Sequence, residues 1–196
     1  SIITIILIFA LQTFVASAKP KQLTPTITWE LQKDGTLMIT GAGDMPDFKA
    51  YTDDFWIKEK TMKKIKKIVI GEGITSIGDC NFYGFISSEN LSGISLPTSL
   101  RSIGENAFGL WPRIPIEIPD GVELIDRQAF KYSIIQTIKL PKNVKIGQEA
   151  FYGSMLTNID FQNGSPSIGK RAFEGCSIVS VENADNLSEE YLNPGY

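Results

Sequence analysis

The chain has 196 residues, of which 42% are hydrophobic and 21% are charged, so it can bury a sizeable core and is not a disordered chain. With 19 basic and 22 acidic residues the net charge is −3, and the chain as a whole has no electrostatic affinity for nucleic acid or an anionic membrane. The absence of histidine excludes catalysis by serine–histidine or cysteine–histidine pairs and zinc sites with histidine ligands.

Residues 1–18 are predicted to be a secretory signal peptide. A nearly uninterrupted apolar run extends from Ile2 to Ala16, and Ala16, Ser17 and Ala18 are the small residues that signal peptidase accepts before a cleavage site. The alternative is an uncleaved anchor, but a membrane-spanning helix needs about 20 apolar residues and this run is shorter. We therefore expect a secreted or cell-surface protein that contacts the membrane only through this segment, before cleavage.

Residues 19–66 are predicted to form a cap that contains a β-hairpin. The pair Asp34-Gly35 lies between two runs with alternating apolar residues, Ile27–Leu31 and Thr36–Ile39. An Asp-Gly pair in this position is a strong hairpin signal. Large aromatic side chains are expected to cover the first coil of the structure that follows, namely Trp29, Phe55 and Trp56.

An acidic cluster in the same segment has two chemical interpretations, and neither is favoured. Asp44, Asp47, Asp53 and Asp54 offer the oxygen ligands that calcium takes, but their spacing fits no EF-hand loop. A glycosidase needs two carboxylates that face each other across a cleft, and nothing in the sequence positions such a pair. The sequence therefore predicts no metal, no cofactor and no catalytic residue.

Four lysines surround Ile65 just before the repeats begin: Lys63, Lys64, Lys66 and Lys67. The favoured interpretation is a solvated edge at which lysine also prevents unwanted strand pairing. The alternative is a small basic patch that binds a polyanion, such as heparin or a bacterial surface polymer.

A seven-residue signature recurs five times within residues 67–183, with Ile at its second position and Phe at its seventh. The copies are Ser76–Phe82, Ser102–Phe108, Leu124–Phe130, Lys145–Phe151 and Ser167–Phe173. Internal repeats with a period of 20 to 50 residues are typical of solenoids and related arrays. Because Phe recurs in one register, we expect its rings to form a continuous inner stack, with a neighbouring Ala leaving room for each ring in four of the copies.

A short apolar triplet precedes each signature. The triplets are Ile68–Ile70, Ile94–Leu96, Ile116–Ile118, Ile138–Leu140 and Ile159–Phe161, followed by a faded sixth, Val181–Asn183. Successive triplets begin 26, 22, 22, 21 and 22 residues apart, which gives a period near 22. Such brief alternation, with proline after three of the triplets, predicts a short strand that ends at a turn. Stacked coils would pair these strands into a parallel sheet, with the flanking residues pointing inward and the middle residue outward.

Repeats of the form I-x-I-P-x-x-V-x-x-I-G-x-x-A-F resemble the BspA-like (Treponema pallidum type) leucine-rich repeats. The resemblance covers residues 68 to about 183 and includes the segment before them, which is similar to the family's N-terminal cap. It implies a repeat solenoid: a leucine-rich-repeat right-handed superhelix with short parallel strands, mostly β and irregular, and an N-terminal β-hairpin cap. Residues 184–196 carry no sixth signature and are expected to be a degenerate C-terminal cap or a truncated repeat.

The outward-pointing middle residues of the triplets are the candidate binding site, because solenoids commonly bind partners on the concave strand face. These residues are Val69, Ser95, Glu117, Lys139, Asp160 and Glu182. The column is mixed in charge and has no aromatic ring, although binding hot spots favour Trp, Tyr and Arg. Trp111 and Tyr132 are alternative anchors or simple packing residues. A loop near residues 83–89, created by four extra residues, either carries binding or is a tolerated insertion.

Two cysteines, Cys80 and Cys176, lie about four coils apart, which is too far for a disulfide. Both are expected to be small buried or half-buried fillers. Sequons for N-glycosylation begin at Asn90, Asn163 and Asn186, but such short patterns often arise by chance. The family that the repeats resemble occurs in bacteria and in protists, so the sequence leaves the use of these sequons open.

The resemblance implies an exported surface or secreted binding protein that mediates adhesion. Its expected partner is a protein, such as fibronectin or fibrinogen of a host matrix, or the surface of another cell. It is not expected to be an enzyme or to bind nucleic acid. Two alternatives stay open: a structural spacer that binds nothing, and an unusual hydrolase that uses carboxylates alone.

Overall fold

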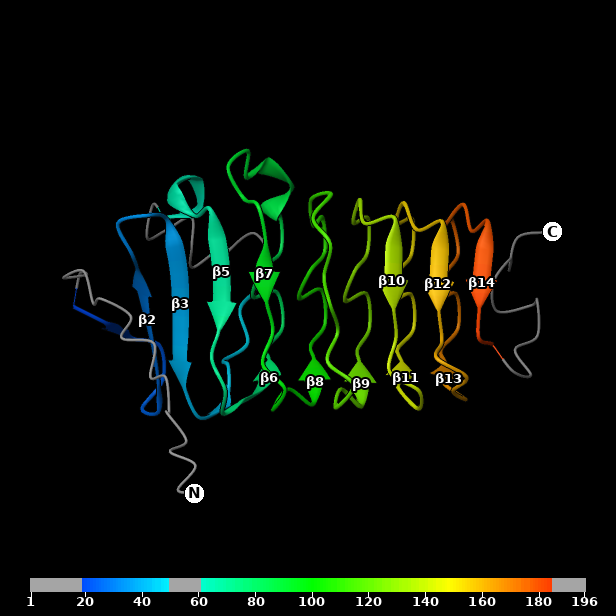
Figure 1. The fold of residues 1–196 in the computed structure, drawn as a ribbon, viewed down its shortest axis with the longest axis horizontal. Helices are drawn as coiled ribbons and strands as arrows, with labels where there is room; N and C mark the ends of the chain where they lie inside the picture. The colour runs from blue at the N-terminus through cyan, green and yellow to red at the C-terminus, as the bar shows by residue number, and fades with distance from the viewer. Residues whose placement is uncertain (1–18, 50–60, 185–196) are drawn as a thin grey trace, which may run out of the picture.

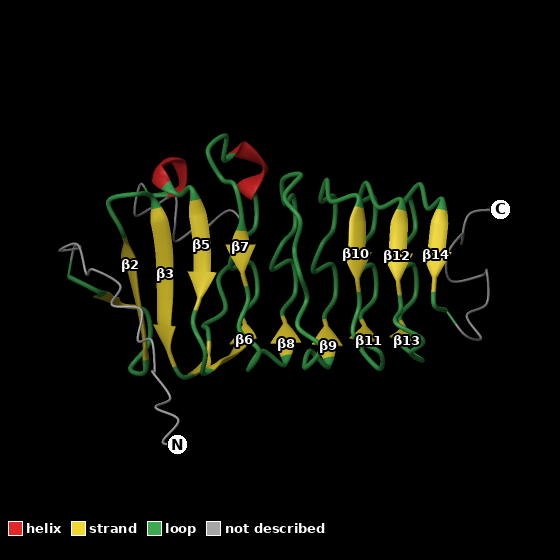
Figure 2. Ribbon diagram, viewed as in Figure 1, coloured by secondary structure: helices red, strands yellow, loops and turns green. Residues whose placement is uncertain are grey.

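The structure is a computed structural model that describes residues 19–49 and 61–184. Within these ranges the chain winds into successive coils that stack along one axis from the cap to the C-terminal side (Figure 1). Strands and loops make up nearly all of it, and the helices are two single 3₁₀ turns, η1 (Met62–Lys64) and η2 (Phe85–Ser87) (Figure 2). The predicted signal segment, Phe55 and Trp56 lie outside the described residues.

The predicted hairpin cap is present and forms the start of the first wall of the solenoid. Strands β2 (Ile27–Leu31) and β3 (Thr36–Gly41) pair antiparallel, and β1 (Lys21–Gln22) extends this hairpin along β2. The turn between β2 and β3 uses Gly35 at a φ of 91°, a conformation that suits glycine. Since β3 pairs in parallel with the strand of the first coil, the cap continues the sheet and shields its end.

The first wall contains two parallel arrays of triplet strands. One array joins the cap through β5 (Lys67–Ile70) and β7 (Ile94–Ser95), and the other contains β10 (Thr137–Lys139), β12 (Asn158–Asp160) and β14 (Ser180–Glu182). The triplet of the third coil, residues 116–118, was expected to be a strand and is not one. The first wall is therefore split into an N-terminal sheet and a C-terminal sheet.

The second wall is a six-stranded parallel sheet that the sequence did not reveal. Its strands are β4 (Gly43–Asp44), β6 (Ile74–Ile77), β8 (Ser102–Ile103), β9 (Leu124–Ile125), β11 (Lys145–Ile146) and β13 (Ser167–Ile168). In the five repeats each strand contains the first two residues of a signature, so the signature Ile is part of a hydrogen-bonded ladder. The split in the first wall has no counterpart here, because β8, β9 and β11 pair without interruption.

The five signature phenylalanines form the predicted stack. Phe82, Phe108, Phe130, Phe151 and Phe173 are fully buried, and neighbouring ring centroids are 5.5, 5.2, 5.1 and 5.2 Å apart. The rings are nearly parallel, with interplanar angles between 5° and 16°. The repeated alanines are also buried, as they must be for rings to stack at the spacing of the coils.

Each signature Phe follows a residue in the left-handed backbone conformation by two positions. These residues are Cys80, Asn106, Gln128, Glu149 and Arg171, with φ between 53° and 60°. A non-glycine residue in this conformation costs roughly 1–2 kcal/mol. Backbone hydrogen bonds between coils compensate for this cost. Alternate N–H groups donate to carbonyls of the next coil, as the N–H of Phe108 does to the carbonyl of Ala129 at 2.7 Å.

The loop near residues 83–89 contains η2 and packs against the core. Phe85 is fully buried, and its ring lies 5.8 Å from Trp111 in a stacked arrangement. The extra residues of this coil therefore accommodate a second pair of large rings beside the phenylalanine stack. Cys80 and Cys176 are not joined by a disulfide and are half-buried, as the filler interpretation predicts.

Candidate functional site

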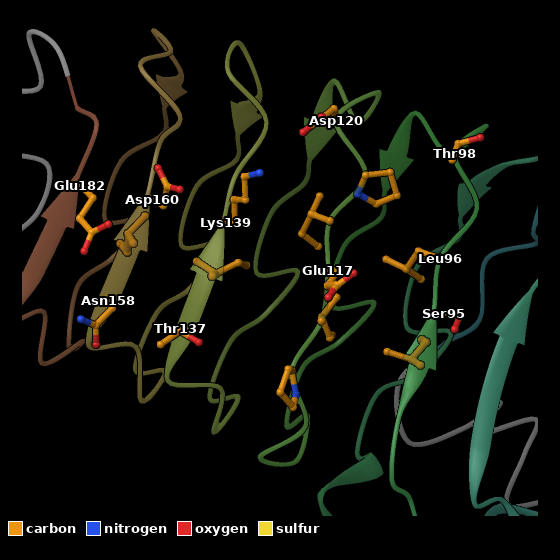
Figure 3. A pocket seen from close by; sticks show the side chains of 17 residues that line it. Ser95, Leu96, Thr98, Glu117, Asp120, Thr137, Lys139, Asn158, Asp160 and Glu182 are labelled. Atoms are coloured by element: carbon orange, nitrogen blue, oxygen red, sulfur yellow. The ribbon is translucent and has the colours of Figure 1, made fainter.

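An open groove with a volume of about 1110 Å³ extends along the first wall from β7 to β14 (Figure 3). Five of the six predicted column residues line it, namely Ser95, Glu117, Lys139, Asp160 and Glu182. The sixth, Val69, is half-buried in β5 and does not line the groove. The solenoid thus brings together side chains that are about 22 residues apart in sequence, one from each coil.

Four more polar side chains line the groove, two at each of its opposite edges. Thr137 and Asn158 begin β10 and β12, and Thr98 and Asp120 follow the triplets of the second and third coils (Figure 3). The sequence prediction did not include them because only the middle residue of each triplet was expected to face outward. Their signal was their place at the ends of the triplets, directly before a triplet for Thr137 and Asn158 and one residue beyond the following proline for Thr98 and Asp120.

The backbone of the third coil, which also lines the groove, does not join the sheet on the side of β7. Pro115 stands at the position where Thr137 begins β10, and proline has no N–H to donate. The N–H of Ile114 bonds instead to the carbonyl of Pro112 within its own loop, at 2.7 Å. The triplet of residues 116–118 therefore has no donor at the point where strand pairing with β7 would begin.

The same coil fails to pair with β10, for a different reason. In later coils the carbonyl two residues before the triplet accepts two N–H groups of the next coil, as Gln136 does from Thr157 and Asn158 at 2.9 and 3.1 Å. The equivalent carbonyl of Ile114 accepts the indole N–H of Trp111 at 3.1 Å. Trp111 is fully buried, so this bond is shielded from water and holds the carbonyl away from the ladder.

Because the first wall is split into two sheets, unpaired backbone N–H groups and partly exposed apolar side chains lie at the floor of the groove. Among the described residues, no partner accepts from the N–H of Leu96 or Ile118, whereas the equivalent N–H of Leu140 donates to Asp160 at 2.9 Å. Ile94 and Leu96 are half-buried, although their counterparts in the fourth coil, Ile138 and Leu140, are buried. The floor of the groove therefore combines unpaired hydrogen-bond donors with partly exposed aliphatic surface.

The charge of the groove is predominantly negative. Its lining includes the carboxylates of Glu117, Asp120, Asp160 and Glu182 and a single ammonium group, that of Lys139. No ion pair or hydrogen bond joins the side chains of Glu117 or Lys139 to another residue in the described part of the chain. These two exposed charges in neighbouring coils are available to a partner.

Asp160 is held in place from several directions. Its Oδ1 accepts from the Nδ2 of Asn183 and from the backbone N–H of Gln162, both at 2.8 Å. The bond from Asn183 lowers the pKa of Asp160 most, followed by the bond from Gln162, and the positive charge of Lys139 adds to the effect. Asp160 therefore stays ionised and serves as a fixed negative charge in the C-terminal half of the groove, between Lys139 and Glu182.

The two alternative anchors have different fates. Trp111 is buried and bonded within the core, so it is not a surface anchor. Tyr132 is 48% exposed but lies outside the groove, where its ring contacts that of Tyr152 with centroids 5.7 Å apart. The ammonium of Lys131 lies 5.4 and 5.3 Å from these two ring centroids.

The described part of the acidic cluster has structural roles. Asp44 accepts from the hydroxyl of Thr75 at 2.7 Å, and Asp47 accepts from the backbone N–H of Asp79 at 2.9 Å. Both bonds attach the segment after the hairpin to the first coil. No group of three or more acidic, cysteine or histidine side chains suited to a metal occurs among the described residues, and Asp53 and Asp54 lie outside them.

The family model described as the BspA type leucine rich repeat region matches residues 59–180 with six copies. This range includes all five signatures and ends at Ser180, the first residue of β14, directly before the faded sixth triplet. The chain belongs to the BspA-type leucine-rich repeat family. No curated protein matches the sequence.

Solved structures with the same BspA-type coil come from bacteria. A leucine-rich repeat protein from Eubacterium ventriosum is 23% identical, with a TM-score of 0.69 over 90% of this chain and 47% of its own. The Treponema pallidum leucine-rich repeat protein is 20% identical, with a TM-score of 0.57 over 84% of each chain. At these identities the likeness concerns the fold, and the present chain spans about half the length of the Eubacterium ventriosum protein.

Within this BspA-type framework, the features that distinguish the chain are the ones that break the repeat. The residues that recur are buried and hold the coils together, whereas Trp111 and Pro115 have no counterpart of the same type in the other coils. Those two residues shape the groove. Self-comparison of the sequence would have marked them only as departures from the consensus.

Proposed function

We propose that this chain is an exported or cell-surface binding protein whose groove on the first wall holds a protein partner. The observation that carries the proposal is the groove itself, where unpaired charges, free backbone donors and partly exposed aliphatic surface lie together along five coils. Membership of a leucine-rich repeat family supports it, since solenoids use their extended strand faces for binding. A host matrix protein, or a protein on another cell, is the partner proposed.

The excess of carboxylates gives the partner a preferred chemistry. Lys139 lies between Glu117 on one side and Asp160 and Glu182 on the other, so a partner with lysine or arginine side chains on both sides of an acidic one matches the column. Such charge complementarity speeds the association of the two proteins and fixes the register in which they bind, more than it raises affinity. The free N–H groups beside the column favour a partner segment with an accessible backbone.

The proposed protein is not an enzyme and uses no metal or cofactor. A general acid requires a carboxyl with a raised pKa, and the groove contains Asp160, whose pKa is lowered. The one carboxyl with a raised pKa in the described part of the chain is Asp79, which does not line the groove. Nucleic acid is not proposed as a partner, because the groove is predominantly acidic.

Export is proposed from the apolar run of residues 1–18, with residues 19–66 as the cap, 67–183 as the repeats and 184–196 as a C-terminal cap or partial repeat. The described part of the chain contains no helix with the length and hydropathy needed to cross a bilayer. Expression of the gene with and without residues 1–18, followed by fractionation and N-terminal sequencing, tests this proposal. Mature protein that begins near residue 19 outside the cell is the expected result.

The binding proposal is tested by a charge exchange that leaves the net charge at −3. We expect Glu117→Lys with Lys139→Glu to reduce binding at least roughly tenfold, because both unpaired groove charges are reversed. The matched control is Glu123→Lys with Lys145→Glu. Glu123 and Lys145 are also exposed and are also 22 residues apart. They lie in neighbouring coils of the second wall, where the backbone N–H of Lys145 donates to the backbone carbonyl of Glu123 at 2.8 Å.

The measurement is equilibrium binding of purified protein to immobilised fibronectin, fibrinogen and a panel of other matrix proteins. Loss of binding in the first exchange with retention in the control supports the groove. Equal loss of binding in both variants would mean that the partner does not bind at the groove of the first wall. If the wild-type chain binds nothing on the panel or on intact cells, the spacer alternative replaces the binding proposal.

A further inference from the structure

A second charged surface lies at the edge where the hairpin turn meets the first coil. We call it the lysine edge, and it consists of Lys33, Lys63, Lys64, Lys66 and Lys67, all of which are exposed. The N–H of Lys66 donates to the carbonyl of Gly35 at 2.8 Å, which fixes the β2–β3 turn beside this segment. Figure 1 shows the turn, η1 and the start of β5 together at the upper end of the first wall.

The favoured interpretation from the sequence is a solvated edge at which lysine also prevents strand pairing; the lysines are exposed to solvent, but the strand-pairing part is wrong. Strand β5 lies in the interior of the N-terminal sheet, paired in parallel with β3 on one side and with β7 on the other. Its backbone has no open edge for a foreign strand, so lysine has no pairing to prevent there. Prevention of strand pairing therefore does not explain why five lysines lie together on this surface.

The lysine edge is short of compensating charge. None of its five ammonium groups forms an ion pair within the described ranges. Asp34 is next to Lys33, but its Oδ1 already accepts from the backbone N–H of Thr36 at 2.8 Å. Glu89, in the loop that follows η2, is a further exposed carboxylate among the described residues, and no ion pair joins it to these lysines.

The backbone beneath the lysine edge is held in place by the neighbouring loop. The hydroxyl and the N–H of Ser92 both donate to the carbonyl of Lys66 at 2.8 Å, and the side-chain amide of Asn90 donates to the carbonyl of Lys63 at 3.3 Å. Ile65, in the middle of the segment, is fully buried and anchors it to the core. The lysines therefore project from a backbone whose position the fold fixes.

We propose that the lysine edge binds a linear anionic polysaccharide. A flexible polymer with a negative group on successive units can contact several lysines at once, and each contact releases a counterion. Ser92 and the amide of Asn90 supply polar neighbours of the kind that hydroxyl-rich sugars contact. The described residues of this edge include no exposed aromatic ring on which bases would stack, so single-stranded nucleic acid is a poorer match.

This site is independent of the groove and differs from it in the sign of its charge. The net charge of −3 means that the molecule as a whole repels a polyanion, so binding requires a local concentration of lysine. The chemistry of the negative group, sulfate or phosphate, is left to the probes. Both groups accept hydrogen bonds from ammonium and interact with it as a point charge.

The experiment uses the chain from residue 19 onward with immobilised heparin as the sulfated polysaccharide probe and phosphomannan as the phosphorylated one. The test variant is Lys63→Gln with Lys64→Gln. The control, Lys142→Gln with Lys145→Gln, removes the same charge from two exposed lysines of the fourth coil. We expect wild type and control to bind at low salt, and the test variant to bind roughly tenfold more weakly.

The salt dependence provides a second readout. The slope of log K against log salt concentration should fall by about one unit for each lysine that contacts the polymer, as it does for phosphate contacts in nucleic acid. Failure of the wild-type chain to bind either probe, or equal weakening by test and control variants, would overturn the proposal. Tighter binding to DNA than to both polysaccharides would replace the proposed ligand by nucleic acid. Thermal unfolding of each variant establishes that it is folded.

Discussion

Residues in the left-handed conformation determine how one coil fits on the next. The residue two positions before each phenylalanine of the stack and the residue two positions after it both have positive φ in all five coils. The second position is glycine in three coils but Leu110 and Tyr132 in the other two. The sequence pattern shows the phenylalanine clearly and the left-handed positions poorly, because no common residue type marks them. Hydrogen bonds to the next coil compensate for the strain there.

A prediction follows for Gly153, which has a φ of 62° and supports the ring of Tyr132. A Cβ at this position would lie 2.6 Å from two carbons of that ring. We expect Gly153→Ala to lower the free energy of unfolding by roughly 2 kcal/mol, from left-handed strain together with displacement of the ring. Gly84→Ala isolates the strain, since Gly84 has a φ of 79° and nothing within 4 Å of a Cβ, and should cost about 1 kcal/mol. Urea unfolding measures both, and equal losses would contradict the ring contact.

The pH dependence of stability should depend on Asp79. Burial raises the pKa of this carboxyl most, and the nearby carboxylates of Asp47, Glu105 and Asp126 raise it further. A group whose pKa is higher in the folded state loses its favourable contribution as pH rises through that pKa. Asp79→Asn should therefore raise the free energy of unfolding at neutral pH, by less than about 1 kcal/mol because the site is screened by solvent.

The asparagine at position 79 keeps the acceptor that Glu105 uses, since the N–H of Glu105 donates to Oδ1 of Asp79 at 2.7 Å. The gain over wild type should disappear as the pH is lowered below the unfolded-state pKa of aspartate, where Asp79 is protonated in both states. Urea titrations of both proteins across this range provide the measurement. A gain that persists unchanged at low pH would mean that the substitution acts through packing rather than charge.

At the scale of elements, the same triplet pattern gives two different outcomes. Ile116–Ile118 and Ile138–Leu140 are both apolar–polar–apolar and both precede proline, yet only the second includes strand residues. The difference originates outside the triplets, in the missing N–H of Pro115 and in the bond from Trp111 to the carbonyl of Ile114. A pattern within one repeat cannot report on such a competition, because the donors and acceptors belong to neighbouring segments.

Hydrogen exchange should reveal the split directly. The last residues of four successive triplets are Leu96, Ile118, Leu140 and Phe161, and the N–H groups of Leu140 and Phe161 donate to the next coil at 2.9 and 3.0 Å. We expect the amides of Leu96 and Ile118 to exchange at least roughly tenfold faster than the other two. Amide exchange followed by NMR gives the four rates. Similar protection at all four positions would contradict the interrupted sheet.

Across the whole molecule, each coil is stabilised mainly by its two neighbours. The phenylalanine stack, the second wall and the ladder at the left-handed positions all connect adjacent coils. A repeat protein of this kind tolerates the removal of one complete unit, because the surfaces on either side match each other. It does not tolerate the removal of half a unit, which shifts every inward-facing side chain out of register.

Deletion of residues 138–158 tests this expectation by removing the fourth coil. Thr137 then precedes Ile159, and Phe130 faces Phe173 in place of Phe151. We expect a folded protein with the circular dichroism of the parent and a lower free energy of unfolding. Deletion of residues 138–148, half a coil, is the control and should give an unfolded or aggregated product. Folding of both deletions, or of neither, would contradict the expectation that the chain tolerates the loss of a whole coil but not of half a coil.

The sequence by itself determined the coil, its period of about 22 residues, the buried phenylalanine stack and the hairpin cap. It could do so because burial repeats with the coil, and apolar residues in a fixed register are visible in a single chain. It also identified five residues that share one face, since the middle of a strand must point away from a packed interior. The second sheet escaped prediction because two residues are too few to show a strand period.

Only the tertiary structure decided where the first wall is interrupted, which polar residues join the groove and whether the lysines protect an edge. Each of these depends on hydrogen bonds between coils. The indole N–H of Trp111 donates to the carbonyl of Ile114, whose equivalent in later coils accepts from the next coil. Strand β7 pairs with the side of β5 at which Lys67 was expected to prevent strand pairing. Hydrogen-bond partners about 22 residues away cannot be assigned from local pattern, since several donors compete for one acceptor. The repeating residues therefore define the fold, and the residues that depart from the repeat define its candidate binding surfaces.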